Sequence, residues 1–191
     1  MSWTRSPATP VRPDRPADPI HPATPSQRAT PDQIGQTTTM TTTPSATTSG
    51  AIPSIVKEVV VPCAPERAFD LFTARIHSWW PMATHSVGGT SSAMLTLDHA
   101  AIVERLEDGT QCTWGTVTVW QPPTRVAFTW HPGAGPDDHT EVSVDFAPIP
   151  EGTHVRLRHS GWERLSGRTG MLENYRSGWD VVLGGFVGAA A

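Results

Sequence analysis

One histidine, His159, lies where a side chain could do chemistry inside the protein. It continues the period-two alternation of Val155 and Leu157 in the stretch THVRLRHS, whose other positions are polar. Because alternate residues of a strand share a face, we expect His159 to point inward unless Gly161 bends the chain. An inward imidazole can donate a hydrogen bond or act as an acid or base. It can equally be a core histidine bonded to a backbone carbonyl.

Tryptophan is the second residue type that could build a site. Seven of the eight tryptophans follow residue 50, together with all five phenylalanines. Aromatic rings usually fill cores, but converging rings with few polar groups also form apolar ligand pockets. Trp130 shares strand parity with Phe128, and Trp179 falls on the apolar stripe of a helix, so both rings should face the interior. The sequence leaves both interpretations of the tryptophan rings open: they fill the core, or they line a ligand-binding site.

The remaining polar residues show no pattern that requires catalysis. The other histidines lack HxxxH, HxH or paired His–Cys spacing, so no metal site is expected. Ser160 directly follows His159, and adjacent strand residues point to opposite faces, which argues against a Ser–His pair. Glu104 and Glu163 are isolated carboxylates, expected to be solvated or salt-bridged. We therefore predict no catalytic residue and no cofactor.

A strand and then a helix are predicted at the start of the domain. The stretch SIVKEVVVPC (54–63) is short and β-branched, as strands are. The next stretch, APERAFDLFTARIHSWW (64–80), keeps apolar residues on one helical face and ends at Pro81, which stops a helix. Trp79 and Trp80 would then form the C-terminal end of this helix. Because neighbours on a helix point about 100° apart, we expect one ring in the core and the other at a cavity rim.

Alternating strands and a long terminal helix make up the rest of the domain. TEVSVDF (140–146) and THVRLRHS (153–160) alternate strictly between apolar and polar residues. Such strands form a sheet with one buried and one wet face. From about Thr169 to Phe186, apolar residues recur at helical spacing. These features predict an α+β helix-grip fold, in which a curved antiparallel sheet of about six to seven strands wraps around the C-terminal helix.

Composition divides the chain into a tail and one domain. Residues 1–50 hold nine of the 19 prolines and include the low-complexity stretch TTTMTTTPSATTSG. Such a segment buries too little apolar surface to offset its ordering entropy. We therefore expect residues 1–50 to be disordered and residues 51–191 to form the domain. Met40 is a candidate true start, which would make residues 1–39 an over-extension.

Charge and hydropathy argue against several classes of partner. The net charge is −4 and no dense basic patch occurs, which argues against nucleic acid. No apolar run is long enough to span a membrane, and the N-terminus lacks the apolar core of a secretion signal. We expect a cytoplasmic protein.

Three stretches of the domain resemble a known superfamily. IVKEVVVPCAPERAFDLFTARIHSWWP, WGTVTVWQPPTRVAFTW and GTHVRLRHSGWE are similar to SRPBCC (START-like) proteins. More narrowly, they resemble bacterial proteins related to the C-terminal domain of the heat-shock-protein-90 ATPase activator. The resemblance runs from about Ile55 to Phe186. It implies a sheet that grips a long helix around a cavity that commonly holds an apolar small molecule. It does not imply one function, since members include ligand carriers, polyketide cyclases and stress-response proteins.

From these features we expect the domain to bind a small apolar or aromatic molecule of unknown identity, without catalysis. A role in a stress response stays open. The cavity would lie between the sheet and the C-terminal helix. The residues expected to line it are Trp80, Phe128, Trp130, Leu157, His159, Met171, Tyr175 and Trp179. Those expected at its rim are Trp79, His85 and Trp162.

Two alternatives stay open. One is an enzyme of the cyclase or hydrolase kind that uses His159 and Tyr175, which requires several polar groups to converge inside the cavity. The other is a protein-interaction or co-chaperone module, or a homodimer. An interaction module requires an exposed apolar patch at the corner formed by Trp79, Trp80 and Pro81.

Overall fold

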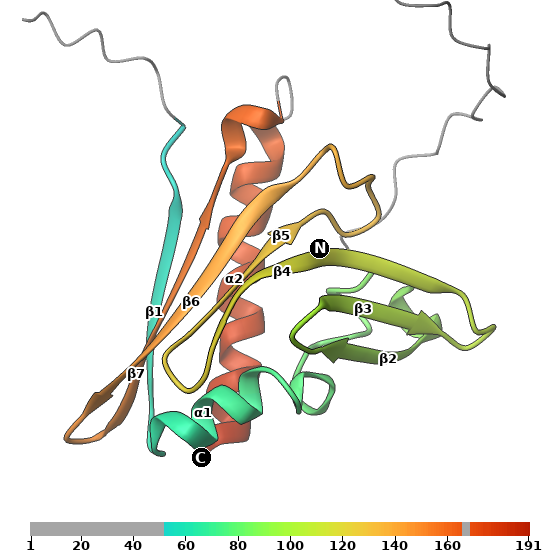
Figure 1. Ribbon diagram of the computed structural model, residues 1–191. Helices are drawn as coiled ribbons and strands as arrows, with labels where there is room; N and C mark the ends of the chain where they lie inside the picture. Colours follow the sequence, from blue (N-terminus) through green and yellow to red (C-terminus); the bar gives the residue numbers. More distant parts are fainter. Residues whose placement is uncertain (1–51, 166–168) are drawn as a thin grey trace, which may run out of the picture. The chain divides into compact units, whose positions relative to one another are not determined.

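The computed structural model of the protein describes residues 52–165 and 169–191 and shows, within them, a seven-stranded antiparallel sheet and two α-helices (Figure 1). The predicted disorder of residues 1–50 and the alternative start at Met40 lie outside the described residues. The strands are β1 (Ile55–Val61), β2 (Ser92–Leu97), β3 (Ala101–Leu106), β4 (Gln111–Gln121), β5 (Arg125–Trp130), β6 (Thr140–Ile149) and β7 (Gly152–Ser160). The helices are α1 (Pro65–Phe72) and α2 (Thr169–Ala190), with short 3₁₀-helices η1 (Ile76–Ser78), η2 (Gly89–Ser91) and η3 (Trp162–Arg164).

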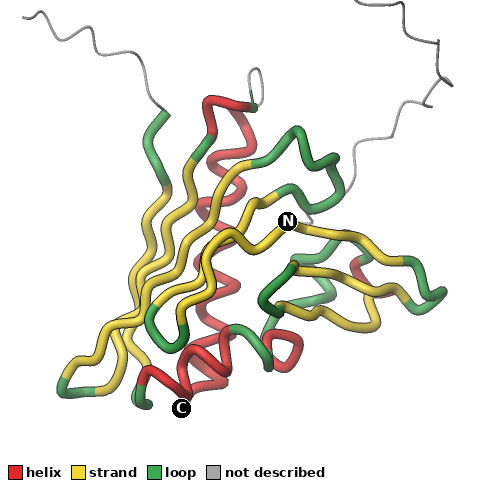
Figure 2. Tube along the Cα trace, in the orientation of Figure 1, coloured by secondary structure: helices red, strands yellow, loops and turns green. Residues whose placement is uncertain are grey.

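The sheet is curved because strand β4 belongs to two sets of strands. The strand order is β1-β7-β6-β5-β4-β3-β2. The first half of β4 pairs with β3, whereas its second half, from Val117 to Gln121, pairs with β5. The register shifts between Val117 and Val119, and such bulges bend a strand and increase its twist. The β2–β3 hairpin therefore turns away from β1, β7, β6 and β5, as Figure 1 and Figure 2 show.

Helix α2 lies across the concave face of the sheet (Figure 2). Its buried side chains recur at helical spacing, and they include Tyr175, Trp179, Val182, Leu183 and Phe186. On β7, the inward side chains of Val155, Leu157 and His159 are buried, while Arg156 and Arg158 stay exposed. The predicted helix-grip fold is confirmed, and His159 points inward as its parity indicated.

Helix α1 ends at Phe72 instead of Trp80. The hydroxyl and the N–H of Thr73 both donate to the carbonyl of Phe69, over 2.7 Å and 2.9 Å, in the last turn of the helix. Thr73 itself leaves the helical conformation, with φ −99° and ψ −84°, and so caps the helix. The chain then forms the short η1 turn before it reaches the two tryptophans.

This break lets both tryptophan rings turn into the core. Trp79 exposes 6% of its surface and Trp80 exposes 5%. The Trp79 ring lies 5.3 Å from the rings of Phe72 and Phe186, and the Trp80 ring lies 5.5 Å from Trp114. The expectation of one core ring and one rim ring was wrong, because it assumed a single continuous helix through both residues.

Gly115 allows the close approach of β4 and β5 beside the bulge. A Cβ atom at this position would lie 1.7 Å from the backbone oxygen of Thr129. We expect Gly115→Ala to lower the free energy of unfolding by about 3 kcal/mol or more, because a backbone atom cannot move aside as a side chain can. Gly135→Ala is the matched control, since a Cβ there meets nothing within 4 Å. Urea denaturation that gave both variants the same stability would contradict this account of the sheet.

Candidate functional site

A continuous chain of hydrogen bonds joins helix α2 to the sheet. The Trp179 Nε1–H donates to Nδ1 of His159 over 3.1 Å. Since an indole N–H can only donate, Nδ1 is the acceptor, and the neutral ring carries its proton on Nε2. Nε2 lies 2.7 Å from the Thr140 hydroxyl and donates to it. That hydroxyl donates in turn to the carbonyl of Trp130 over 3.1 Å, so both ring nitrogens of His159 have partners.

Burial keeps His159 and the neighbouring Tyr175 uncharged at neutral pH. The His159 side chain is fully buried, and burial lowers its pKa to about 3. Burial also raises the pKa of Tyr175 to about 12, against the opposing effect of a hydrogen bond from the Trp130 side chain. A neutral histidine with both nitrogens bonded has no position left for a substrate proton. The arrangement therefore does not favour His159 as a general acid or base.

Most of the predicted pocket residues pack against one another. The buried ones are Trp80, Phe128, Trp130, Leu157, His159, Tyr175 and Trp179. The centroid of the Trp130 ring lies 5.5 Å from that of Trp179 and 5.6 Å from that of Trp114. The Trp80 ring lies 6.0 Å from Trp179, edge to face. These rings fill much of the space between the sheet and α2 where the central cavity was expected.

The predicted rim residues lie in the core instead of at a rim. Trp79, His85 and Trp162 are all buried. The indole N–H of Trp79 donates to the carbonyl of Leu71 over 2.7 Å. The Trp162 ring lies 4.1 Å from the ring of His159. The indole N–H of Trp162 donates to the carbonyl of His159. Trp79 and Trp162 are therefore buried for the same reason, because each indole reaches inward to a backbone carbonyl.

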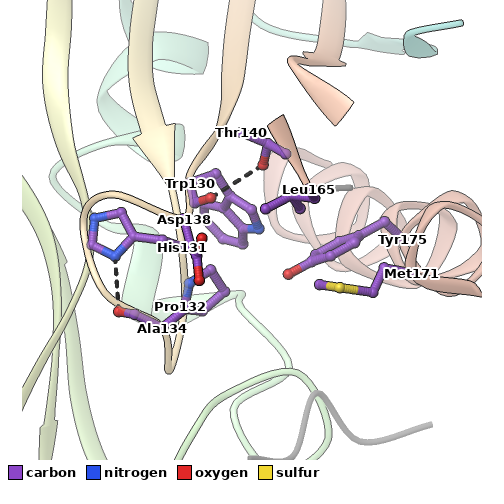
Figure 3. Close-up of a pocket in the computed structure, with 9 residues that line it drawn as sticks. All are labelled: Trp130, His131, Pro132, Ala134, Asp138, Thr140, Leu165, Met171 and Tyr175. Carbon is purple, nitrogen blue, oxygen red and sulfur yellow. Dashed lines mark hydrogen bonds between the residues drawn. The ribbon is translucent and has the colours of Figure 1, made fainter. Parts of the chain in front are cut away.

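A small hollow does lie between the β5–β6 loop and the start of α2 (Figure 3). Its volume is about 30 Å³, which is room for water but not for an organic molecule. Of the predicted pocket residues, Trp130, Met171 and Tyr175 line it. The sequence did not indicate its other lining residues, which are His131, Pro132, Ala134, Asp138, Thr140 and Leu165. Most of these belong to a loop, where no periodicity reports which side chains face inward.

A buried carboxylate, Glu104, was also misjudged from the sequence. Its side chain has no exposed surface, whereas a solvated or salt-bridged residue was expected. One carboxylate oxygen accepts the N–H of Gly88 over 2.9 Å and the hydroxyl of Ser92. The other accepts the N–H of Val87 over 3.0 Å and the indole N–H of Trp114 over 2.9 Å. Four donors thus replace the hydration that burial removes.

Glu104 holds the loop between η1 and β2 against the sheet. Two further bonds tighten that loop, since the Ser86 and Ser92 hydroxyls lie 2.7 Å apart and Ser86 accepts the N–H of Gly89 over 2.9 Å. Strand parity could have predicted that Glu104 is buried, because it lies two residues after Ile102 in AIVERL and so shares the buried face of the strand. A carboxylate at an inward position needs hydrogen-bond donors around it, so this parity was the signal in the sequence that pointed to a buried, hydrogen-bonded Glu104.

Within residues 52–165 and 169–191, no group of three or more His, Cys, Asp or Glu side chains could hold a metal ion. No described helix is both long and apolar enough to cross a membrane.

Replacement of Glu104 by glutamine should destabilise the protein. The variant Glu104→Gln keeps the shape but turns one acceptor oxygen into an N–H₂ group that faces two donors. We expect the free energy of unfolding to fall by about 3 kcal/mol, the order of the cost of buried donors left without acceptors. The control Glu163→Gln changes an exposed residue and should cost less than about 0.5 kcal/mol. Equal denaturant midpoints for the two variants would refute the anchoring role of Glu104.

The stability of the protein should depend on pH through His159. The unfolded histidine takes up a proton below pH 6.5, whereas the folded one stays neutral until about pH 3. Stability therefore falls with falling pH in this window, by about 1.4 kcal/mol per pH unit from this group. Urea denaturation of His159→Gln should show a shallower dependence by that amount. His99→Gln, at an exposed position, should keep the full slope, and identical slopes for both variants would count against the argument.

Comparisons with known proteins agree with this architecture. Residues 62–190 match the family model described as activator of Hsp90 ATPase homolog 1-like protein. The structure of the Aha1 dimer from Colwellia psychrerythraea is 19% identical, with a TM-score of 0.54, and the match covers 73% of this chain and 96% of that one. Protein BH1534 from Bacillus halodurans is 18% identical, with a TM-score of 0.54 and coverage of 74% and 99%. At these identities, both structures show a shared fold.

A third structure is closer in sequence but not in shape. The anthrahydroquino-Gama-pyrone synthase Txn09, complexed with SUM, is 30% identical over 69% of this chain and 85% of its own. Its TM-score is 0.45, at which the superposition supports no conclusion about function. No curated protein matches the sequence. Because the family model covers well over half of the residues, the chain belongs to the family of activator of Hsp90 ATPase homolog 1-like proteins.

Proposed function

We propose that this protein binds a small apolar or aromatic molecule, without transforming it, in the hollow between the β5–β6 loop and α2. The observation that carries the proposal is the lining of the hollow, where the rings of Trp130 and Tyr175 lie beside Met171 and Leu165. Apolar and aromatic walls with a few polar groups are typical of ligand sites. The resemblance to START-like proteins, which implies an apolar ligand between sheet and helix, supports the same function.

The hollow must widen to admit an organic ligand. A benzene-sized molecule occupies a cavity of roughly 150 Å³, against the 30 Å³ found here. The side chains of Met171 and Leu165 are only half-buried, and methionine adapts readily to a changed neighbour. Ala134 and Asp138 lie in an exposed part of the β5–β6 loop. Binding would therefore take place at the edge of the aromatic core, between parts that can move, and leave its centre intact.

A cyclase- or hydrolase-like reaction at His159 and Tyr175 has weaker support. Both ring nitrogens of His159 are bonded inside the protein. The pKa of Tyr175 is raised to about 12 by burial, far from the range in which a proton is exchanged easily at neutral pH. A reaction would have to break the bonds that tie α2 to the sheet.

A protein-interaction or co-chaperone role lacks the surface that was expected for it. The patch was expected at the corner formed by Trp79, Trp80 and Pro81, and both tryptophan rings are buried. The Colwellia psychrerythraea relative is a dimer. A homodimer of the present chain would rest on other residues.

Titration with 2-phenylethanol, followed by NMR on ¹⁵N-labelled protein, tests the binding function. At about 0.4 kcal/mol per non-hydrogen atom, a molecule of this size should bind with a Kd on the order of 1 mM. We expect saturable shifts of the Trp130 indole signal and the Tyr175 amide. Ala134→Trp should abolish them by filling the hollow, whereas Ala83→Trp, at another exposed alanine, should not. Binding that is absent, or that survives in Ala134→Trp, would defeat the proposal.

A further inference from the structure

We propose that the outer edge of strand β1 pairs with β1 of a second copy of this chain, with Val56 on the two-fold axis. The proposal concerns a surface remote from the hollow and does not depend on ligand binding. Its starting observation is an unusual concentration of exposed apolar side chains. Of the four large hydrophobic side chains that are exposed among the described residues, Ile52, Val56 and Val60 lie on or just before β1. The fourth, Val181, lies on α2.

Strand β1 has the properties that allow an edge strand to pair with a strand of another chain. It is the terminal strand of the sheet, with β7 as its neighbour on one side (Figure 1). All seven of its residues pair with β7 in unbroken register, from Ile55 opposite His159 to Val61 opposite Thr153, so no bulge twists the edge away. Proteins normally blunt a regular apolar edge with charges, bulges or a cover, because its backbone groups are a template for another strand.

The charges on β1 do not protect this edge. Lys57 points to the side of the sheet that α2 covers and forms an ion pair with Asp180 of that helix. Glu58 points to the opposite face, where it pairs with Arg156 over 3.3 Å. Both charges are therefore engaged within the same protomer. The opposite edge of the sheet differs, because His77 of η1 accepts the backbone N–H of Leu95 in β2.

The spacing of the exposed residues matches a second copy of the same strand. Val56 and Val60 lie on one face of β1, and Ile52, three residues before the strand, continues their spacing of four. An antiparallel pair centred on Val56 sets Val56 against its own copy and Ile52 against Val60, in both directions. The same register sets Ser54 against Glu58, so no like charges meet. A two-fold interface requires this kind of self-complementarity, in which one patch serves both partners.

Sedimentation of the full chain across a range of concentrations tests the pairing. We expect a monomer–dimer equilibrium, in which Val56→Lys weakens dimerisation at least about tenfold by placing two ammonium groups opposite each other. Val181→Lys is the matched control and should leave the equilibrium unchanged. A purely monomeric protein, or a dimer that Val56→Lys leaves intact or Val181→Lys disrupts, would overturn the proposal.

A cross-linking experiment tests the register itself. Residues that face each other across an antiparallel pair have Cα atoms about 4.5–5.5 Å apart, which suits a disulfide. Val56→Cys should therefore form a covalent dimer under mild oxidation, whereas Val60→Cys should not, because its partner position is Ile52. The unmutated protein controls for its own cysteines, Cys63 and Cys112. Efficient cross-linking through Val60→Cys but not Val56→Cys would refute the register.

Discussion

The bond between Trp179 and His159 is the constraint on which the rest of the core depends. It joins the middle of helix α2 to the last strand of the sheet, and it continues through Thr140 to the backbone of β5. An indole and an imidazole buried without partners would each cost free energy, so the helix is stable only where both are satisfied. Apolar packing alone tolerates sliding, whereas a directional bond sets the position of the helix along its axis.

Glu104 plays a comparable part at the other end of the sheet. Its four donors come from the loop after η1, from β2 and from β4, so that one carboxylate connects three segments. Trp114 is bonded to this carboxylate and also packs against Trp80 and Trp130. The same loop also lies near the β5–β6 loop, because a Cβ atom placed on Gly133 would be 3.6 Å from a methyl group of Val87. The buried polar groups and the aromatic core therefore form one connected system.

The buried tryptophan rings limit where a ligand could bind. A START-like fold suggests a ligand in its centre, but here tryptophan rings occupy much of that space. The N–H groups of four of them are bonded to His159, Glu104 and backbone carbonyls; the four are Trp179, Trp114, Trp79 and Trp80. Opening the centre would break these bonds as well as the ring contacts. The hollow beside Met171 and Leu165 can widen at lower cost, since only half-buried side chains and a surface loop have to move.

The sequence by itself determined the repeating parts of this protein. The alternation in residues 140–146 and 153–160 fixed two strands and the inward direction of His159, and the helical stripe from Tyr175 to Phe186 fixed α2. Periodicity reports such features because the geometry of the backbone imposes it locally. The apolar face of the sheet and the apolar stripe of the helix then predicted that the sheet wraps around α2, an arrangement that the resemblance to START-like proteins also implied.

Only the tertiary structure decided the fate of the residues between those elements. Helix α1 ends at Phe72, where Thr73 leaves the helical conformation, and both Trp79 and Trp80 beyond this break are buried. Glu104 is buried because donors distant in sequence converge on it. Most of the lining of the hollow that was not predicted comes from the β5–β6 loop, which has no period to read. These outcomes depend on which groups meet in space, and a single residue in a sequence carries no record of its partners.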